Sequence, residues 1–518
     1  MTKRLSINSV VFTQLYCFVS MALYGWFFFR EGMDDNLAVW YMPIIFVMMW
    51  QILFVVFNLL PPRVFKPLSV GLLILNAVAF YFTSAYNVQI DKIMFMNAMQ
   101  TDKAEVGALM NLQFGFAVVL MGIIPALAFC ALNIIKVDFP NRLKASLAAL
   151  MVCVLSGSIC HPQTDKFLHR FKYLMEYLPP INYIAGGSSA VFEVLKPHPP
   201  MRRISEDIRP LSKHGKPNLI VFIVGETTRA ANFSLNGYHR PTNEALTPYL
   251  KEIAYYPDTQ ACGTSTAVSV PCMFLPTPRE EYKTGSELHI ENLLDVYKQA
   301  GYRILWRDND GGCKHICDRV LYEEPCDEKV CLDDILLRGL KGKITASRDN
   351  QLIVLHTRGS HGPTYNQQYD ESSNHYAPAC QDNYLWNCTP EELTNAYDNT
   401  VHYVSGFIAR TIELLQSLQG RYNTALFYVS DHGESLGEDD QYLHAAPYNK
   451  APDYQINVPM LLWLPQNNDF NLSTLCLKQQ AQAGYSHDNV FHSLLGLSGI
   501  KGAIYNPELD IFSTCRKK

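Results

Sequence analysis

A run of apolar residues at positions 10–29, with no charged side chain, places the strongest constraint on what this chain can fold into. A helix of that length crosses the ~30 Å hydrocarbon core of a bilayer. Four similar runs follow at residues 41–60, 68–86, 114–135 and 143–160, and the last of them is shorter and begins beside Lys144. We therefore predict an α-helical transmembrane bundle of five spans, followed by a soluble region.

Basic residues in the short loops predict the orientation of these spans. They lie before the first span, between the second and third, and between the fourth and fifth: Lys3, Arg4, Arg63, Lys66, Lys136, Arg142 and Lys144. By the positive-inside rule the amino terminus is cytoplasmic, and five spans place the chain after Cys160 on the far side of the membrane. A cleaved signal peptide is the alternative for the first run, but that run is long and lacks a clear small-residue cleavage site.

The cysteines divide at the same boundary. Those in or at the end of the spans are Cys17, Cys130, Cys153 and Cys160. Those clustered in the soluble region are Cys262, Cys272, Cys313, Cys317, Cys326, Cys331, Cys380 and Cys388. Such clustering fits disulfides in an oxidising compartment, with the pairing left open by sequence alone. A zinc knuckle around His315 is the alternative for one pair, and Cys476 and Cys515 could form a further pair or stay free.

A segment rich in proline separates the spans from the soluble region. Aromatic side chains beside lysines and arginines at residues 166–178 suit a helix lying on the membrane surface, or an ordinary packed helix. The predicted domains are therefore a five-span transmembrane domain at residues 1–160, a linker with amphipathic helices at 161–213, and a soluble catalytic domain at 214–518.

The soluble region opens with a continuous apolar run, NLIVFIVG at residues 218–225, of the kind that is buried on both faces of a parallel sheet. Two more such runs follow at residues 351–355 and 424–429, and helical patterns at 287–300 and 391–418 lie between strands. This alternation predicts an α/β domain with a mainly parallel sheet.

Polar side chains follow these three strands, where functional groups gather in open α/β sheets. Glu226 follows the first run, residues 356–361 follow the second, and Asp431 and His432 follow the third. Two carboxylates and an imidazole suit zinc or, less tightly, manganese. Each residue alone also fits a turn with a helix cap, as Gly433 illustrates, but three of them at strand ends favour a metal site.

Five ordered motifs resemble those of the bacterial phosphoethanolamine transferases, in particular the enzymes acting on lipid A, including the mobile colistin-resistance enzymes. The motifs are VGETTR at residues 224–229, CGTSTA at 262–267, SHGP at 360–363, SDHGES at 430–435 and YLH at 442–444. The resemblance spans the whole chain, because that family also has five transmembrane helices before a periplasmic domain of the alkaline phosphatase and sulfatase superfamily. It implies a multi-pass protein of the bacterial inner membrane with its catalytic domain in the periplasm.

The resemblance also implies roles for the motif residues. Thr266 would be the nucleophile and, with Glu226, Asp431 and His432, a ligand of one zinc ion. Zinc coordination favours the alkoxide of a hydroxyl that is a poor nucleophile at its own pKa. The run GTSTAVS around Thr266 could open a helix whose N–H groups face a phosphoryl oxygen, or it could be a Ser/Thr-rich loop.

Three further residues match family positions near the metal. His361 and His444 could hold a second zinc, bind the transferred phosphate or move protons, although each alone also fits a surface or packing histidine. Lys314 aligns with a phosphate or substrate contact of relatives, but Gly311 and Gly312 stand where some relatives carry polar side chains. Family-like disulfides would join neighbouring cysteines: Cys262 with Cys272, Cys313 with Cys317, Cys326 with Cys331, and Cys380 with Cys388.

The implied activity is transfer of phosphoethanolamine from phosphatidylethanolamine to a lipid A phosphate, through a covalent phosphoethanolamine-threonine intermediate. This transfer would lower the negative charge of the envelope and confer resistance to polymyxins, including colistin. The expected partners are the donor lipid, the lipid A acceptor and inner-membrane lipids, with the protein acting as a monomer. The formal net charge of -5 argues against a nucleic-acid partner.

Several alternatives remain open. The acceptor could be Kdo, core heptose, a glucan or a protein instead of lipid A. A phosphoglycerol transferase or a hydrolase shares the general plan, although the Cys-x-Pro-x-Arg signature of sulfatases is absent around Thr266. A non-catalytic membrane sensor would have a degenerate site, whereas Glu226, Thr266, Asp431 and His432 are all present.

Overall fold

The computed structural model describes residues 5–517 except 25–40, 87, 101–105, 108, 160–178, 198, 212–214 and 329. The chain forms two compact units, each discontinuous in sequence. The helical unit comprises Met1–Phe95 and Met110–Val194, and the α/β unit comprises Met96–Leu109 and Leu195–Lys518. The membrane-surface helix expected at residues 166–178 lies outside the described residues.

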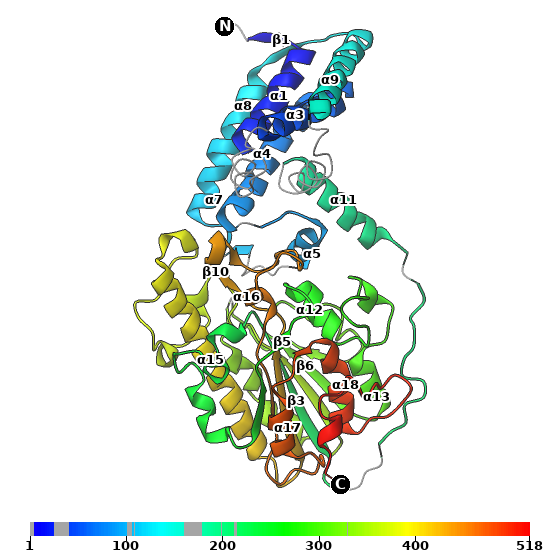
Figure 1. Cartoon of the computed structure of the whole chain (residues 1–518), viewed down its shortest axis with the longest axis vertical. Helices are drawn as coiled ribbons and strands as arrows, with labels where there is room; N and C mark the ends of the chain where they lie inside the picture. Colours follow the sequence, from blue (N-terminus) through cyan, green and yellow to red (C-terminus); the bar gives the residue numbers. More distant parts are fainter. Residues whose placement is uncertain are drawn as a thin grey trace. The chain divides into compact units, whose positions relative to one another are not determined.

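The described chain up to residue 195 is mostly helical (Figure 1). Its helices are α1 Ser9–Tyr24, α3 Tyr41–Leu59, α4 Pro62–Tyr86, α5 Lys92–Gln100, α7 Leu112–Ala117, the π-helix η1 Val118–Ile123, α8 Ile124–Ala131, α9 Phe139–Ile159 and α11 Ile181–Leu195. Three helical runs are long and apolar enough to cross a membrane: Pro62–Tyr86, Leu112–Ala131 and Phe139–Ile159. At the first two predicted spans, the described residues form shorter apolar helices, Ser9–Tyr24 and Pro43–Leu59.

Two predicted span boundaries differ from the structure. The fourth run was expected to reach residue 135, but α8 ends at Ala131, and β2 (Asn133–Ile135) pairs in parallel with β1 (Ser6–Asn8). The fifth helix begins at Phe139 rather than near residue 143, and it therefore includes Arg142. This arginine is buried, and its Nη2 donates to Leu59 O at 2.7 Å, so its charge does not break the helix.

Aromatic rings form the core of the helical unit. Phe12, Tyr16, Phe57, Phe65 and Phe129 pack with ring centroids 5.1 to 6.0 Å apart, mostly edge to face. Edge-to-face packing brings the positive ring edge against the negative face of the neighbouring ring. These contacts join α1, α3, α4 and α8 into one bundle.

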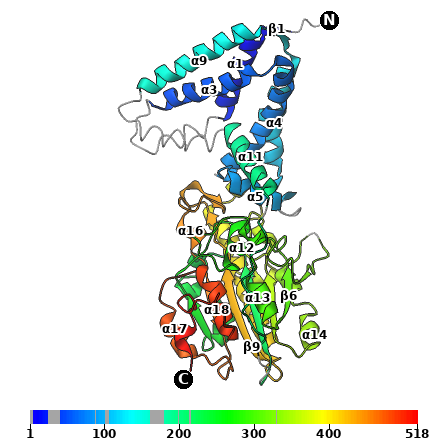
Figure 2. The ribbon, with the colours of Figure 1, turned by 90° about the vertical axis from the view of Figure 1, so that its right-hand side faces the viewer.

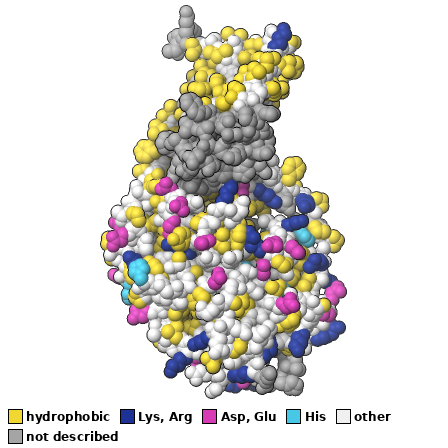
Figure 3. Space-filling view, in the orientation of Figure 1, with side chains coloured by type: hydrophobic (Ala, Val, Ile, Leu, Met, Phe, Trp, Pro, Cys, Tyr) yellow, Lys and Arg dark blue, Asp and Glu magenta, His cyan; other side chains and the backbone are white. Residues whose placement is uncertain are grey.

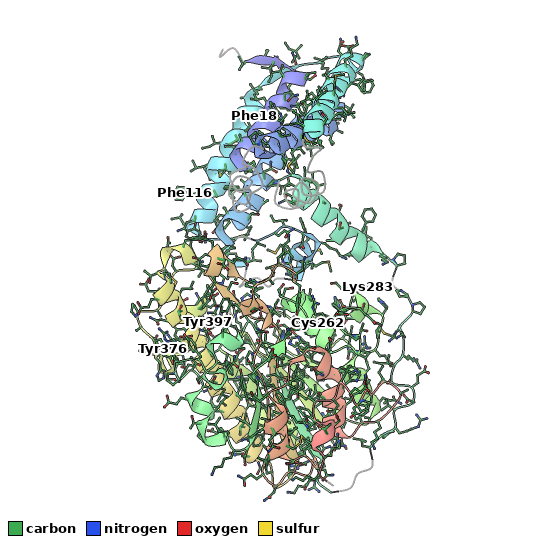
Figure 4. The ribbon with its side chains drawn as sticks, viewed as in Figure 1. Phe18, Phe116, Cys262, Lys283, Tyr376 and Tyr397 are labelled. Atoms are coloured by element: carbon green, nitrogen blue, oxygen red, sulfur yellow. A yellow bond between two sulfur atoms is a disulfide. The ribbon has the colours of Figure 1, made fainter. Side chains whose placement is uncertain are left out.

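The outer surface of the helical unit is apolar. In Figure 3 the coloured part of this unit is mostly hydrophobic, whereas charged side chains are scattered over the α/β unit. Phe18 on α1 and Phe116 on α7 are 43% and 60% exposed (Figure 4). Large exposed apolar side chains on long helices are expected where lipid rather than water is the solvent.

The α/β unit is built on a seven-stranded sheet of order β4-β12-β9-β3-β8-β6-β7. The strands are β3 Asn218–Gly225, β4 Ile253–Tyr256, β6 Arg303–Asp308, β7 Leu321–Glu323, β8 Gln351–His356, β9 Asn423–Ser430 and β12 Met460–Trp463. β9, β3, β8, β6 and β7 are parallel, and β12 is antiparallel to both β9 and β4. The predicted α/β class with a mainly parallel sheet is thus confirmed.

Helices cover both faces of this sheet (Figures 1 and 2). α12 (Thr266–Met273), α13 (Leu293–Gln299) and α18 (Asp488–Ser498) lie on one face, packed on Phe222 and Phe427 among others. The long α15 (Pro390–Gln416) lies on the other face. Burial on both faces explains why the central strands are continuous apolar runs rather than alternating patterns.

The remaining described helices of this unit are short: α14 Leu340–Thr345, α16 Asp453–Ile456 and α17 Thr474–Gln480. The helical pattern expected at residues 391–418 matches α15 closely, and its start is fixed by a capping box between Thr389 and Glu392. The pattern expected at 287–300 gives a shorter helix, because Asn292 caps α13 just before Leu293.

Five disulfides lie in the α/β unit. Four have the expected neighbour pairing, Cys262–Cys272, Cys313–Cys317, Cys326–Cys331 and Cys380–Cys388, and the fifth joins Cys476 to Cys515. The pairing of Cys313 with Cys317 excludes the zinc-knuckle alternative. Cys17, Cys130 and Cys153, all in the helical unit, are free.

Candidate metal centre

Strand register brings the polar side chains together at one edge of the sheet. Val224 pairs with His356, His356 pairs with Asp308, and Gly225 pairs with Ser430. Since β3, β6, β8 and β9 are parallel, their carboxyl ends meet at this edge. Glu226 and Asp431 each follow directly after one of these strand ends, and both are fully buried.

The backbone after β3 is held tightly in place. Thr227 has a left-handed φ of 50°, and its carbonyl accepts a hydrogen bond from Tyr397 Oη on α15 at 2.6 Å (Figure 4). Gly359, with φ of 53°, passes so close to the backbone of Glu226 that a Cβ would collide with it. These contacts fix the direction of the Glu226 carboxylate, and a strained residue such as Thr227 is typical of functional sites.

Glu226, Asp431 and His432 form a buried group whose ligand atoms all lie within 4.8 Å of one another. His432 Nδ1 lies 2.9 Å from Gly433 O, an acceptor, so Nδ1 carries the proton and Nε2 presents a lone pair. This Nε2 lies 3.4 Å from Glu226 Oε1 and 3.3 Å from Asp431 Oδ2. Neither carboxylate oxygen has a hydrogen-bond partner. Two carboxylate oxygens without hydrogen-bond partners, converging with an imidazole nitrogen, fit a metal cation.

Thr266 completes this group at the first residue of α12. Its Oγ1 donates to Glu226 Oε2 at 3.1 Å and lies 3.4 Å from His432 Nε2. The helical alternative for the GTSTAVS run is therefore the observed one, with Ser265 in the N-cap position. The Cys262–Cys272 disulfide closes the segment that carries Thr266. Cys262 is labelled in Figure 4.

Burial shapes the protonation of this group. It raises the pKa of Glu226, with the charge of Asp431 adding to the rise, and it also raises the pKa of Asp431. It lowers the pKa of His432 well below the usual value, and neighbouring His444 adds to that effect. All three groups are thus biased to their neutral forms by the protein, and a bound cation would bias the carboxylates to their charged forms.

His361 and His444 lie beside His432. The ring centroid of His444 is 4.6 Å from that of His432 and 5.2 Å from that of His361, and His444 Nδ1 lies 3.3 Å from Glu434 Oε2. Burial lowers the pKa of His361 strongly, and the neighbouring His444 adds to the drop. Among the described residues, the groups of three or more metal donors include neither His361 nor His444. Their geometry places two imidazoles next to the candidate metal ligands.

The contacts described for Lys314 do not include Thr266 or the candidate metal ligands around it. Its φ is 49°, and its Nζ donates to Gly311 O at 3.3 Å. Burial raises the pKa of Asp310 to about 7, and the positive charges of His356 and Lys314 oppose that rise.

The sequence interpretation placed Glu226 and His356 at this edge but missed the two carboxylates that follow from β6. Asp308 ends β6, Asp310 follows it, and His356 ends β8; Glu226, Asp310 and His356 form a second group of candidate metal donors. The strand β6 was not predicted, so the carboxylates after it were not placed at the sheet edge. The usable signal was the short apolar stretch ILW at residues 304–306, followed by Asp308 and Asp310.

Comparison with known proteins places the whole arrangement in a family. The family model described as Sulfatase matches residues 218–500, and the model for phosphoethanolamine transferase EptA/EptB matches residues 48–193. The chain is 40% identical over 473 residues to phosphoethanolamine transferase EptA of Escherichia coli (strain K12), covering 87% of this chain and 86% of that protein. It is 36% identical over 427 residues to phosphatidylethanolamine transferase Mcr-1 of Escherichia coli, covering 77% and 78%.

A solved structure agrees over the full length. The integral membrane protein lipooligosaccharide phosphoethanolamine transferase A (EptA) from Neisseria meningitidis superimposes with a TM-score of 0.93 at 32% sequence identity, covering 99% of this chain and 100% of that one. Both units therefore have counterparts in one relative. On this fold, this sheet-edge geometry and these identities, the chain belongs to the phosphoethanolamine transferase family.

Proposed function

We propose that the protein transfers phosphoethanolamine from phosphatidylethanolamine to a phosphate of lipid A, with Thr266 as the nucleophile. The observation that carries this proposal is the position of Thr266 Oγ1, 3.1 Å from Glu226 Oε2 and 3.4 Å from His432 Nε2. A hydroxyl at a helix start, beside buried carboxylates with unpartnered oxygens, is the arrangement that an activated alcohol nucleophile requires. Family membership supports the transferred group.

We assign one zinc ion to Glu226, Thr266, Asp431 and His432. The unpartnered oxygens of Glu226 and Asp431 and the lone pair of His432 Nε2 support this assignment. When bound there, the ion would lower the pKa of the Thr266 hydroxyl and offset negative charge on the phosphoryl oxygens. His432 is held for this role by its Nδ1 contact with Gly433 O.

The chain's own residues then carry the two transfers. In the first, Thr266 Oγ1 attacks phosphorus, the bond from phosphorus to the diacylglycerol oxygen breaks, and the threonine proton ends on that oxygen. In the second, an oxygen of the lipid A phosphate attacks, the bond from phosphorus to Thr266 Oγ1 breaks, and the proton of the acceptor returns to Thr266. His361 and His444, beside His432, are the groups placed to hold phosphoryl oxygens or carry these protons.

The proposal includes a membrane location for this chemistry. We propose five spans within residues 1–160, a linker at 161–213 and a catalytic domain at 214–518, in the inner membrane with the catalytic domain in the periplasm. The five disulfides support an oxidising compartment, and the apolar helices support a membrane location. Both lipids can then reach a monomer of the protein from one leaflet.

The nucleophile is tested on the full-length protein in detergent. Incubation with phosphatidylethanolamine should add the mass of phosphoethanolamine to the peptide that contains Thr266, and Thr266→Ala should lack the adduct. The matched control is Thr264→Ala in the same loop, because Thr264 Oγ1 donates to Ala446 O rather than to the candidate ligands. An adduct on another residue, or full turnover by Thr266→Ala, would overturn the assignment.

The acceptor is tested in cells. Expression in a polymyxin-susceptible Gram-negative host should raise the mass of lipid A by one or more phosphoethanolamine groups and raise polymyxin tolerance, because the added ammonium offsets the phosphate charge. Unmodified lipid A together with phosphoethanolamine on another envelope glycan would move the assignment to that acceptor.

A further inference from the structure

The ends of β6 and β8 bring a second set of acidic and imidazole groups to Glu226. The ligand atoms of Glu226, Asp310 and His356 all lie within 4.8 Å of one another. The side chains of His356 and Glu226 are fully buried, and that of Asp310 is only 10% exposed. The Nε2 atom of His356 lies 3.8 Å from Asp310 Oδ2, which is too long for a hydrogen bond.

Asp308 fixes the orientation of His356. Its Oδ2 lies 2.9 Å from His356 Nδ1 and accepts from Trp306 Nε1 at 2.8 Å. Its Oδ1 accepts the backbone N–H groups of Asp310 and Gly312 at 2.9 and 2.8 Å. Because Asp308 accepts at both oxygens, His356 Nδ1 is the protonated nitrogen and Nε2 is directed to Asp310 and Glu226. A carboxylate holding one imidazole nitrogen so that the other meets a cation is a recurrent arrangement at metal sites.

Unpartnered atoms point to a ligand in this second group. His356 Nε2 and Glu226 Oε1 are buried and have no hydrogen-bond partner. A buried polar atom left unpaired costs about 1 to 3 kcal/mol. His356 Nδ1 and both oxygens of Asp308 do have partners, so the unpaired nitrogen of this imidazole is the one that faces Asp310.

We propose that Glu226, Asp310 and His356 bind a second divalent cation of the zinc or manganese class, with Glu226 shared between the two cation sites. Two carboxylates and one imidazole match the ligand preferences of these ions. Through Glu226 the proposal rests on the metal site assigned under the proposed function. Asp308 is a positioning residue, since it reaches the cation only through His356.

The test counts metal in the full-length protein in detergent, stripped with a chelator and dialysed against zinc. Wild type should bind two equivalents by elemental analysis, and Asp310→Asn should bind one. Asp308→Asn should weaken the second equivalent by about 10- to 100-fold. The matched control is Asp318→Asn, whose carboxylate pairs with His315 at 3.0 Å on the exposed surface (side chains 52% and 51% exposed), and it should keep both equivalents.

A second measurement needs no variant. Wild type loaded with manganese should give the exchange-coupled electron paramagnetic resonance spectrum of two ions bridged by one carboxylate. One equivalent of metal with the spectrum of an isolated ion would overturn the proposal, and His356 would then be a protonated partner of Asp308 and Asp310. One zinc with an adduct on Thr266 would remove the second site and keep the proposed function, whereas two zinc ions without that adduct would do the reverse.

Discussion

The two units of this protein bury polar side chains of different kinds. In the described part of the helical unit, the buried polar side chains are hydroxyls, amides and the guanidinium of Arg142, and they include no carboxylate. Tyr24 Oη, for example, lies 2.7 Å from Met121 O in the π-helix, and Asn58 Nδ2 donates to Arg142 O at 2.9 Å. The α/β unit instead buries carboxylates completely, Glu226 and Asp431 among them.

Buried neutral groups and buried carboxylates require different partners. The N–H of a neutral amide or the O–H of a hydroxyl can donate to one backbone carbonyl, and a π-helix frees such carbonyls. A buried carboxylate needs opposite charge or several donors, because burial penalises the ionised form far more. The buried polar side chains described in the helical unit are therefore neutral or, at Arg142, paired with a backbone carbonyl, whereas the edge of the sheet buries carboxylate oxygens that have no hydrogen-bond partner.

Replacing a carboxylate at the sheet edge by a neutral amide should have the largest effect on transfer activity. Asp431→Asn replaces a candidate ligand by an amide of nearly the same shape, as in the helical unit. We expect transfer to lipid A to fall about 10³-fold or more, together with loss of bound zinc, because an amide oxygen is a poorer ligand than a carboxylate. The assay is phosphoethanolamine transfer in mixed micelles, with zinc counted on the same samples. If the zinc content and the transfer rate are unchanged, the negative charge of Asp431 is not required for metal binding or for transfer.

Opening a disulfide should have the next largest effect. The pair Cys476–Cys515 spans 39 residues, and removing it by a double serine substitution should lower the free energy of unfolding by about 3 kcal/mol. The matched control is Cys130→Ser, because Cys130 is an exposed free thiol in the helical unit. Urea unfolding followed by tryptophan fluorescence measures both. Equal stability of the two variants would show that this cross-link does not hold the α/β unit.

Acidification should weaken the α/β unit. Burial lowers the pKa of His487 to about 4, and its Nδ1 accepts the N–H of Cys262. The unfolded chain, with an ordinary histidine pKa near 6.5, therefore binds the extra proton between about pH 6.5 and 4, and stability falls as pH falls through that window. The expected slope is about 1 kcal/mol per pH unit. The described residues of the helical unit contain no histidine.

Hydrogen exchange resolved by peptide measures this difference. Protection of β9 should decrease from pH 6.5 to 4 after correction for intrinsic exchange, while that of α4 should stay constant. His487→Gln should flatten the response of β9. Equal pH sensitivity in both units would contradict the role given to buried histidine.

The smallest effect is expected inside the helical bundle. Asn58 on α3 donates to Arg142 O at 2.9 Å and to Ser146 Oγ at 3.0 Å on α9, and these helices run side by side (Figure 2). Asn58→Leu should cost only about 1 kcal/mol, because each of the two bonds between membrane helices is typically worth about 0.6 kcal/mol. Unfolding in mixed detergent micelles, with transfer activity retained, is the measurement. If the free energy of unfolding falls by several kcal/mol, neutral hydrogen bonds in the helical unit are as important as the buried carboxylates at the sheet edge.

Sequence predicted those parts of the fold whose signal is local. The three buried strands β3, β8 and β9 are continuous apolar runs, and Glu226, Asp431 and His432 follow two of them directly. The structure brings these three residues together with Thr266, and their assigned roles remain proposals.

The rest of the site depends on the pairing of strands that are distant in sequence, which no local sequence pattern predicts. β6 begins at Arg303 and carries Arg307 near its end, so its apolar stretch is short, yet it pairs in register with β8 along its whole length. Arg307 is buried because its Nη1 donates to Leu336 O and Arg338 O. The contact of Asp308 with His356 spans 48 residues of sequence and is set by sheet order alone. The early start of α9 has a similar origin, since Nη2 of the buried Arg142 donates to a carbonyl at the end of α3.

The disulfides imply an order of maturation. All ten cysteines of the α/β unit are joined in pairs, and one of them, Cys262, lies four residues before Thr266. As free thiolates these residues would compete with the carboxylates for zinc, because sulfur is a favoured zinc ligand. Under the proposed zinc assignment, oxidation of these cysteines before metal loading would leave the sheet-edge donors without competition from sulfur. We therefore expect the protein made in a host with little oxidising capacity to bind zinc without gaining transfer activity.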